Sequence, residues 1–197
     1  MNRFRHLQTI PDGPFRFIAI DVETANKSNA SICQIGLCFV NVRNQLQTFS
    51  TLVNPEGPFD PFNTQIHGIT SDMVTQAPNF ADAYGALYAV LEDNHLARHS
   101  RFDERAFEAA CARYEMSMVT SHWTNSVQVA RKAWPEFKGA GGHGLAHLKK
   151  VLGLEFHHHD AGEDARASAT VILLAEERMR APLPHLKVER QLTFQFN

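Results

Sequence analysis

The sequence contains few of the features that mark secreted, membrane-embedded or disulfide-stabilised proteins. Its three cysteines, Cys33, Cys38 and Cys111, are odd in number and form no Cys-x-x-Cys pair, which argues against a disulfide framework or a zinc ribbon. No apolar run approaches the roughly 18 residues needed to span a bilayer, and the N-terminus has no apolar core of a secretory signal. We therefore expect reduced thiols, a cytoplasmic protein and no membrane partner.

The sequence also lacks a strong charge bias, a repeat and a low-complexity segment. Its 197 residues are 44% hydrophobic and 20% charged with a formal net charge of −2, which is typical of one globular domain. Nucleic-acid binders are usually strongly basic, so this balance does not indicate that class, although it is compatible with a protein that binds only a strand end. Residues 131–150 are an exception with five Lys or Arg and one acid, which fits either a solvated face or a phosphate-facing flank.

Hydrophobic periodicity predicts an α/β domain at 15–180, between a leader at 1–14 and a tail at 181–197. A meander followed by alternating helices and strands favours a mixed five-stranded sheet with helices on both faces. The expected elements are strands at 15–21, 32–42, 46–53 and 95–98, a short helix after Thr70, helices at about 79–91, 103–114 and 161–179, a strand running into a helix between 122 and 134, and a helix that Gly153 ends. Pro55, Pro58 and Pro61 predict an extended loop.

Two carboxylates, Asp21 and Glu23, interrupt the apolar run "FIAIDVETAN" where the first strand is expected to end. Side chains two residues apart in a strand point to the same face, so these acids lie side by side. Two neighbouring anions repel each other unless one is protonated or a cation lies between them. The pattern therefore predicts a cation, provided that other segments supply further oxygen ligands.

Two further acids lie at element junctions. Asp103 is found where a strand leads into a helix, and Asp164 lies in the first turns of the last helix. Acids near helix N-termini are common for dipole reasons alone, so each position by itself also fits an ordinary structural role. The combination is more specific, because its order along the chain can be compared with a known pattern.

The motifs resemble those of the DEDDh 3′–5′ exonucleases, a family that includes proofreading subunits of replicative DNA polymerases. "FIAIDVETAN" is similar to the first motif, "SICQIG" to the strand after it, "IHGIT" to the loop that meets the terminal nucleotide, "ARHSRFD" to the second motif and "HHHDAGEDARASA" to the third. The resemblance extends from about Phe15 to Arg178 and implies a ribonuclease-H-like α/β fold. The metal ligands that it implies are Asp21, Glu23, Asp103 and Asp164.

The resemblance also implies how these residues divide the chemistry. Oxygen ligands favour hard ions, and two Mg²⁺ or Mn²⁺ ions are expected. Asp21 would bridge them, with Glu23 and Asp164 on the ion beside the attacking water. Asp103 would hold the second ion. His159 is the expected general base, because an imidazole pKa of about 6.5 suits proton transfer near neutrality.

His159 is the last member of a run of three histidines, residues 157–159, which raises the alternative of a zinc site. Consecutive side chains of an extended segment diverge, so the run is not expected to close such a site by itself. A tyrosine base, which a sister subfamily uses, is disfavoured because the three tyrosines lie far from Asp164 in the sequence.

Substrate contacts are expected to be largely independent of base sequence, through the nucleic-acid backbone and stacking. Thr24 and Ala25 follow the first two acids and are positioned to meet the terminal nucleotide. Ile66 and His67 could wedge or cap its base, and Phe102 could pack against it. Plain packing roles for Ile66 and Phe102 are the alternatives.

Two positions depart from the family pattern. Arg98 and His99 replace the usual His-Asn at the start of the second motif, so no substrate role is transferred to His99. Asn125 stands where many relatives have Asp, and this change is expected to affect a structural hydrogen bond. Neither departure alters the four acids or His159.

The sequence therefore predicts an enzyme that releases 5′-mononucleotides from 3′ ends of single-stranded or frayed DNA. Family members that trim RNA tails or degrade oligoribonucleotides are the main alternative, because contacts to the 2′-hydroxyl separate the two polymers and the motifs do not show them. A nucleic-acid-binding module without turnover is the other alternative, against which the intact acids argue. A polymerase partner would have only the tail at 181–197 to dock on, which favours a free-standing enzyme, and the same tail could form a homodimer contact.

Overall fold

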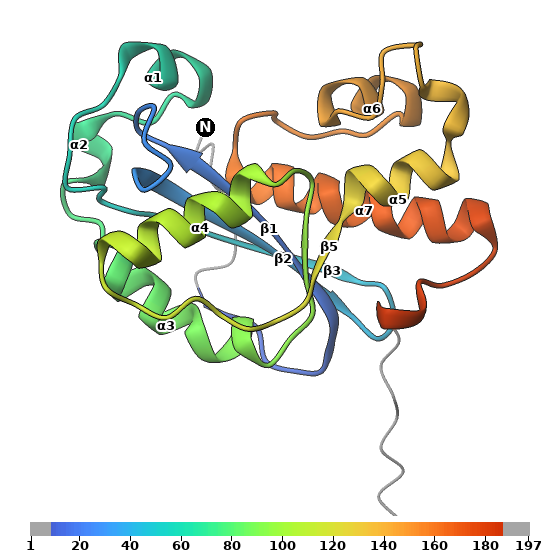
Figure 1. Ribbon diagram of the computed structural model, residues 1–197, viewed down its shortest axis with the longest axis horizontal. Helices are drawn as coiled ribbons and strands as arrows, with labels where there is room; N and C mark the ends of the chain where they lie inside the picture. The colour runs from blue at the N-terminus through green and yellow to red at the C-terminus, as the bar shows by residue number, and fades with distance from the viewer. Residues whose placement is uncertain (1–8, 187–197) are drawn as a thin grey trace, which may run out of the picture.

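One mixed sheet organises residues 9–186, which are the residues that the computed structural model describes. Its five strands follow the order β3-β2-β1-β4-β5 (Figure 1). They are β1 (Phe15–Thr24), β2 (Ile32–Asn41), β3 (Leu46–Leu52), β4 (Leu96–Arg98) and β5 (Trp123–Asn125). The central strand β1 pairs antiparallel with β2 and parallel with β4. The predicted mixed five-stranded sheet is confirmed.

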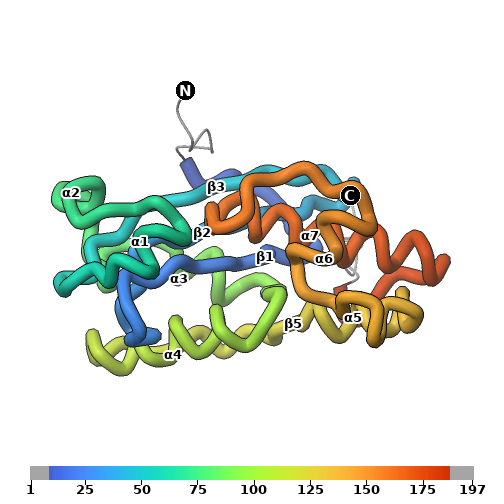
Figure 2. The backbone as a smooth tube through the Cα atoms, turned by 90° about the horizontal axis from the view of Figure 1, so that it is seen from above, coloured from blue at the N-terminus to red at the C-terminus, as the bar shows by residue number. Residues whose placement is uncertain are grey.

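Helices cover both faces of this sheet, as predicted. The α-helices of the described residues are α1 (Pro61–His67), α2 (Ser71–Val74), α3 (Phe80–Glu92), α4 (Phe102–Arg113), α5 (Ser126–Ala133), α6 (Leu145–Leu152) and α7 (Ala161–Met179), with 3₁₀ turns η1 (Pro135–Phe137) and η2 (Pro184–Leu186). Helices α3 and α4 share a core with one face, and α7 packs on the other, with α5 and α6 beside it (Figures 1 and 2). Among the described residues, no helix has the length and apolarity to cross a membrane.

The alternation of side chains along β1 decides which helices each face meets. Ile20 belongs to the core shared with α3 and α4, whereas Phe17 and Ala19 pack with the alanines of α7. Asp21 and Glu23 continue this second series, because side chains of a strand alternate with a period of two. The period therefore turns both acids towards α7.

Helix α7 approaches the sheet closely because β2 carries a glycine opposite Asp21. Gly36 is the register partner of Asp21, and a Cβ atom at Gly36 would lie 2.0 Å from the backbone carbonyl carbon of Ala161. The side chain of Gln34 accepts a hydrogen bond from the backbone N–H of Ala161 at 3.1 Å. These contacts hold the first turn of α7 beside the acids of β1.

Pro61 begins a helix, so the prediction that it prolongs an extended loop is wrong. The Asp60 side chain accepts a hydrogen bond from the backbone N–H of Phe62 and caps α1, and Pro61 occupies the first turn. Proline is well suited to this position, because the first backbone N–H groups of a helix have no intrahelical partner. The outcome places the "IHGIT" segment at the end of α1, which Gly68 terminates with a φ of 75°.

The first part of the expected tail packs against the domain. Residues 181–186 end in η2, where Leu186 is 1% exposed and lies in the same core cluster as Phe17 and Ile172. The remainder of that tail, 187–197, and residues 1–8 of the expected leader lie outside the described residues.

Candidate active site

The acids of the three motifs line one cleft of about 320 Å³ at the carboxyl ends of β1 and β4. Because these two strands are parallel, the segment that follows β4 emerges beside the end of β1. Asp103 lies in the first turn of α4, directly after that segment, and Asp164 lies near the start of α7. The charged and imidazole side chains of the cleft are Asp21, Glu23, His99, Asp103, His158, His159 and Asp164.

Asp21, Glu23 and Asp164 form the closest oxygen group. One carboxylate oxygen of each lies within 4.8 Å of the other two. Asp103 lines the same cleft, and its Oδ1 accepts a hydrogen bond from the backbone N–H of Val22 at 3.3 Å. Three carboxylate oxygens at this spacing are a donor set that hard divalent ions prefer.

Burial and mutual repulsion raise the pKa of these acids. Burial, followed by repulsion from the surrounding acids, raises the pKa of Asp21 well above its ordinary value. Burial first and then the charges of Asp164 and Asp103 raise the pKa of Glu23 to about 8. Burial raises the pKa of Asp103 to about 7, although hydrogen bonds from backbone N–H groups and the charge of Arg98 oppose the shift. Because the protein alone disfavours so many neighbouring anions, these residues fit a divalent cation.

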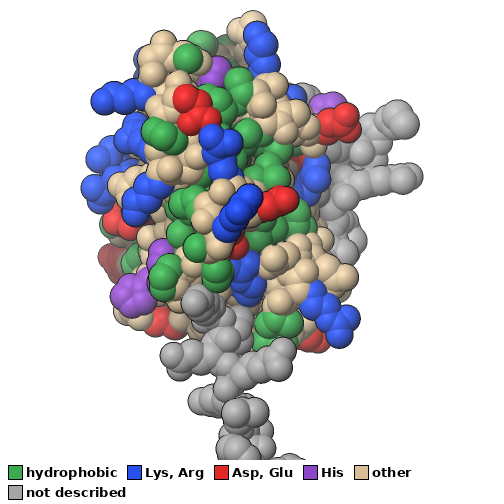
Figure 3. All heavy atoms as spheres, turned by 90° about the vertical axis from the view of Figure 1, so that its right-hand side faces the viewer, with side chains coloured by type: hydrophobic (Ala, Val, Ile, Leu, Met, Phe, Trp, Pro, Cys, Tyr) green, Lys and Arg blue, Asp and Glu red, His purple; other side chains and the backbone are tan. Residues whose placement is uncertain are grey.

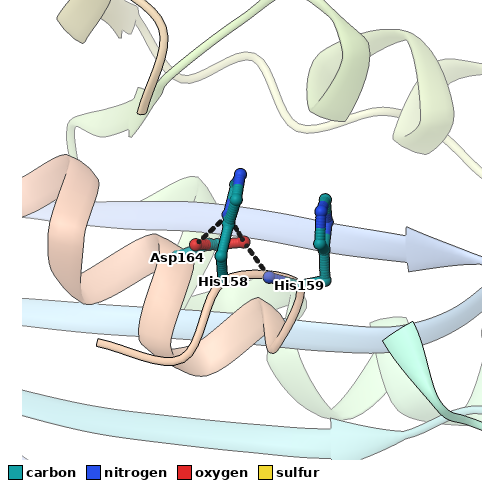
Figure 4. Close-up of side chains that lie close together, drawn as sticks. All are labelled: His158, His159 and Asp164. Atoms are coloured by element: carbon teal, nitrogen blue, oxygen red, sulfur yellow. Dashed lines mark hydrogen bonds and ion pairs between the residues drawn. The ribbon is translucent and has the colours of Figure 1, made fainter. Parts of the chain in front are cut away.

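His158 and His159 lie on the same side of the chain, so the prediction that consecutive histidines diverge is wrong for this pair. The backbone of His159 is left-handed, with a φ of 66°, and the segment therefore turns instead of extending. Their imidazole rings stack with centroids 4.1 Å apart and planes inclined by 17° (Figure 4). His158 Nδ1 lies 3.0 Å from both oxygens of Asp164, and the backbone N–H of His159 donates to Asp164 Oδ2 at 2.8 Å.

His159, the predicted base, lines the cleft next to the acids. Burial first and then the neighbouring His158 lower the pKa of His159, while the charge of Asp164 opposes the shift. The imidazole is therefore neutral near pH 7 and has a nitrogen that can accept a proton. Sequence reasoning missed the contact of His158 with Asp164, because no pattern distinguishes the members of the histidine run until the left-handed turn is known.

A second cleft, of about 260 Å³, adjoins the first and shares Glu23 and Phe102 with it. Four of the five predicted substrate contacts line this second cleft, namely Thr24, Ile66, His67 and Phe102. The side chain of Ala25 is buried and is not among the lining residues. Polar side chains that the motifs did not indicate also line it, namely Asn26, Lys27, Asn29 and Asn63.

His67 is buried and uses both of its ring nitrogens within the chain. Nδ1 accepts a hydrogen bond from the backbone N–H of Ile69 at 3.0 Å, so Nε2 carries the proton and donates to the backbone oxygen of Thr24 at 3.2 Å. These bonds fasten the end of α1 to the end of β1. Phe102, by contrast, is 42% exposed where the two clefts meet.

The positions that depart from the family pattern have structural partners. Arg98 forms an ion pair with Glu104 at 2.5 Å. His99 is hydrogen-bonded through Nδ1 to Ser126 Oγ at 2.8 Å and through Nε2 to a backbone oxygen at 3.0 Å, and burial lowers its pKa to about 4. Asn125 caps α5 by accepting hydrogen bonds from two backbone N–H groups of its first turn, which confirms the predicted structural role.

The sequence matches known proteins over most of its length. A family model described as Exonuclease (RNase_T) matches residues 18–172. A PolC-type DNA polymerase III of Streptococcus pneumoniae is 27% identical over 162 residues, and the PolC-type polymerase of Caldanaerobacter subterraneus subsp. tengcongensis is 27% identical over 166 residues. These matches cover 80% and 83% of this chain but only 11% and 12% of the polymerases, so the chain spans a small part of these relatives.

Solved structures with a similar backbone include three nucleases. Exonuclease X in complex with 5′-overhanging duplex DNA is 22% identical with a TM-score of 0.65, over 82% of this chain and 91% of that chain. The nuclease domain of 3′hExo, a DEDDh family member bound to rAMP, is 18% identical with a TM-score of 0.67, over 85% and 94%. Exonuclease I is 19% identical with a TM-score of 0.72, over 83% and 41%. At these identities the likeness shows the fold, which is the predicted ribonuclease-H-like fold.

Proposed function

The chain belongs to the Exonuclease (RNase_T) family, and we propose that it is a 3′–5′ exonuclease of the DEDDh type that acts on the 3′ ends of single-stranded or frayed DNA and releases 5′-mononucleotides. The observation that carries the proposal is the convergence of Asp21, Glu23 and Asp164, whose oxygens lie within 4.8 Å of one another. A neighbouring cleft of about 260 Å³ offers space beside these oxygens for a terminal nucleotide.

In this proposal the four acids hold two Mg²⁺ or Mn²⁺ ions. Asp21 would contribute to both ion sites, Glu23 and Asp164 would complete one of them, and Asp103 would contribute to the other. When bound, such ions neutralise the phosphate, activate water and stabilise the leaving oxygen. A donor set of carboxylate oxygens favours these hard ions over zinc.

His159 accepts the proton of the attacking water in the same proposal. Its lowered pKa keeps the ring neutral at physiological pH, and its place in the cleft next to Asp164 supports the role. Phe102 and Ile66 would hold the terminal base by apolar contact, because both line the second cleft and Phe102 is 42% exposed. His67 would act indirectly, by fixing α1 against β1.

DNA is the proposed polymer and RNA the alternative. The side-chain amides of Asn63 and Asn26 line the second cleft, but they already donate to the backbone oxygens of Thr24 at 2.8 Å and Pro58 at 2.6 Å. One N–H of each amide is therefore already bonded within the chain, which leaves fewer donors to recognise a 2′-hydroxyl. A DNA oligomer and an RNA oligomer of matched sequence, digested side by side, test the choice directly.

The central experiment uses a 5′-labelled single-stranded DNA oligomer with Mg²⁺ or Mn²⁺. We expect labelled products that shorten from the 3′ end, and we expect Asp21→Asn to abolish them. Asp12→Asn is the matched control, because Asp12 is an exposed acid that lines neither cleft. Early release of the labelled end, or full activity in Asp21→Asn, would contradict the proposal.

A further inference from the structure

Asp164 faces two alternative sets of metal-ligating groups. One set is formed with the oxygens of Asp21 and Glu23. The other is formed with His158 and His159, and one ligand atom of each residue in either set lies within 4.8 Å of the others. Figure 4 shows the two stacked rings beside the carboxylate, with His158 directed at it. The same carboxylate is therefore common to an all-oxygen site and to a nitrogen-rich site.

The two sets have different chemical preferences. Carboxylate oxygens select hard ions, whereas two imidazole nitrogens and one carboxylate oxygen are a set that binds zinc with an open fourth position. Zinc–ligand bonds of about 2.0–2.1 Å in a tetrahedron separate neighbouring ligand atoms by about 3.3 Å. His158 Nδ1 lies 3.0 Å from both oxygens of Asp164, close to this separation, so an ion there replaces the proton of a hydrogen bond. His159 reaches the same ion when its ring turns out of the stack with His158, because imidazole lone pairs lie in the ring plane.

We propose that His158, His159 and Asp164 form a second metal site that binds Zn²⁺ or a similar borderline transition ion. The site is distinct in its donors from the one formed with Asp21 and Glu23, and it uses His158, which the exonuclease chemistry does not require.

The surrounding contacts hold Asp164 and the ring of His158 close together before an ion arrives. Asp164 is 3% exposed, and it accepts the backbone N–H of His159 at 2.8 Å, which fixes the turn relative to α7. The ring of Phe156 packs edge-on against that of His158, with centroids 5.9 Å apart and planes inclined by 82°. Ordering the ring of His158 therefore costs less than in an open histidine run, and less ordering favours binding.

The effect on catalysis follows from the shared residues and rests on the proposed function. An ion on His159 occupies the nitrogen lone pair that would accept the proton of water. The same ion uses an oxygen of Asp164 that the all-oxygen site needs. Zinc bound at this second site is therefore expected to inhibit the Mg²⁺-dependent reaction.

Zinc binding can be measured without turnover. Calorimetric titration of Zn²⁺ into metal-free, untagged protein should reveal one ion per chain at this site, and Co²⁺ in its place should give the visible absorption of tetrahedral nitrogen and oxygen coordination. We expect His158→Ala and His158→Gln to weaken zinc binding at least tenfold. His157→Ala is the matched control, because His157 is an exposed member of the same run outside both ligand sets.

Asp21→Asn separates the two sites, because zinc held by the histidines should survive this substitution. Zinc binding that disappears in Asp21→Asn but persists in His158→Ala would assign the ion to the carboxylates and overturn the proposal. Equal losses of zinc affinity in His157→Ala and His158→Ala would indicate non-specific binding by the histidine run. That result would also overturn the proposal. These readouts require no nuclease activity, so their failure is distinguishable from failure of the proposed function.

Inhibition provides the second test. The ratio of rates with and without zinc should fall in the wild type and in His157→Ala at the same zinc concentration. His158→Ala should require at least ten times more zinc for the same fall. An unchanged zinc requirement in His158→Ala would contradict the inhibitory role even if binding is observed.

Discussion

Each acid of the proposed metal site occupies a position where folding brings like charges together. Asp21 and Glu23 share one face of β1, and Asp164 meets them from α7, so the repulsion among them arises from the same contacts that create the site. Repulsion without an ion favours protonated carboxyl groups. The metal-free protein should therefore lose stability in a defined pH range.

Glu23→Gln tests how much charge repulsion at Glu23 lowers the stability of the metal-free protein. The pKa of Glu23 is raised from an ordinary 4.5 to about 8, so between these values the folded protein binds the proton more tightly than the unfolded chain. The free energy of unfolding then falls as pH rises through this window. After allowance for solvent screening, we expect the free energy of unfolding of the variant at pH 8 in EDTA to exceed that of the wild type by about 1 kcal/mol. This difference corresponds to a rise of about 2–4 °C in Tm.

Thermal melts at pH 4.5 and pH 8 provide the measurement. The two proteins should differ little at pH 4.5, where the carboxyl group is largely protonated in the folded wild type. A difference of the same size at both pH values would mean that packing, and not the charge of Glu23, sets the effect.

His159→Ala tests the proton acceptor. Turnover on the DNA oligomer should fall by about 10²–10⁴, which is the usual contribution of a positioned general base. Because the pKa of His159 is lowered, the wild-type rate should rise through the acid range and level off at a lower pH than an ordinary imidazole would give. His157→Ala should match the wild type in both respects, and a near-wild-type rate in His159→Ala would remove this residue from the mechanism.

At the scale of elements, the site depends on how closely α7 approaches β2. The alanines of α7 and Gly36 of β2 remove side-chain volume where the helix crosses the sheet. Gln34 then bonds to the first turn of the helix. The position of Asp164 therefore depends on small residues that carry no chemistry of their own.

Gly36→Ala should displace this helix. The added Cβ would lie 2.0 Å from the backbone of Ala161, so α7 must move away from the sheet. We expect a loss of about 3 kcal/mol in the free energy of unfolding, measured in urea, together with weaker Mn²⁺ binding.

Gly85→Ala is the matched control, because Gly85 is an exposed position of α3 where an added Cβ meets nothing within 4 Å. It should gain about 0.5–1 kcal/mol from helix propensity. Similar stability changes in the two variants would contradict the close-approach argument.

At the scale of the whole molecule, the clefts and the packing of η2 lie at different parts of the sheet. The carboxyl ends of β1 and β4 carry the clefts, while η2 closes the core beneath α7 with Leu186. The basic segment at 131–150 runs through α5 and α6, and Figure 3 shows Lys and Arg side chains projecting from the side of the molecule where these helices lie. Leu145 of this segment lines the cleft that contains the four acids.

Leu186→Ala tests whether the folded domain extends beyond residue 180. Leu186 is 1% exposed, so truncation should lower the free energy of unfolding by about 2–4 kcal/mol. Val151→Ala, at a position 40% exposed on α6, should cost less than about 0.5 kcal/mol. Equal effects in urea denaturation would indicate that η2 contributes nothing to the core.

The sequence alone determined the architecture and the acids. The period of two along β1 set the common face of Asp21 and Glu23, the order of strand and helix patterns gave the mixed sheet, and the motifs identified Asp103 and Asp164. These features depend on the regular geometry of single elements, which a local pattern reveals. The cap formed by Asn125 is of the same kind.

Only the tertiary structure decided which side chains lie together at the turns. The left-handed backbone of His159 and the burial of Asp164 bring His158 into the site, Pro61 begins a helix instead of extending a loop, and Leu186 returns to the core. The physical reason is that a turn dihedral or a distant packing contact depends on the surroundings in the folded chain. The periodicity of a helix or strand, in contrast, depends only on residues that are close together in the sequence.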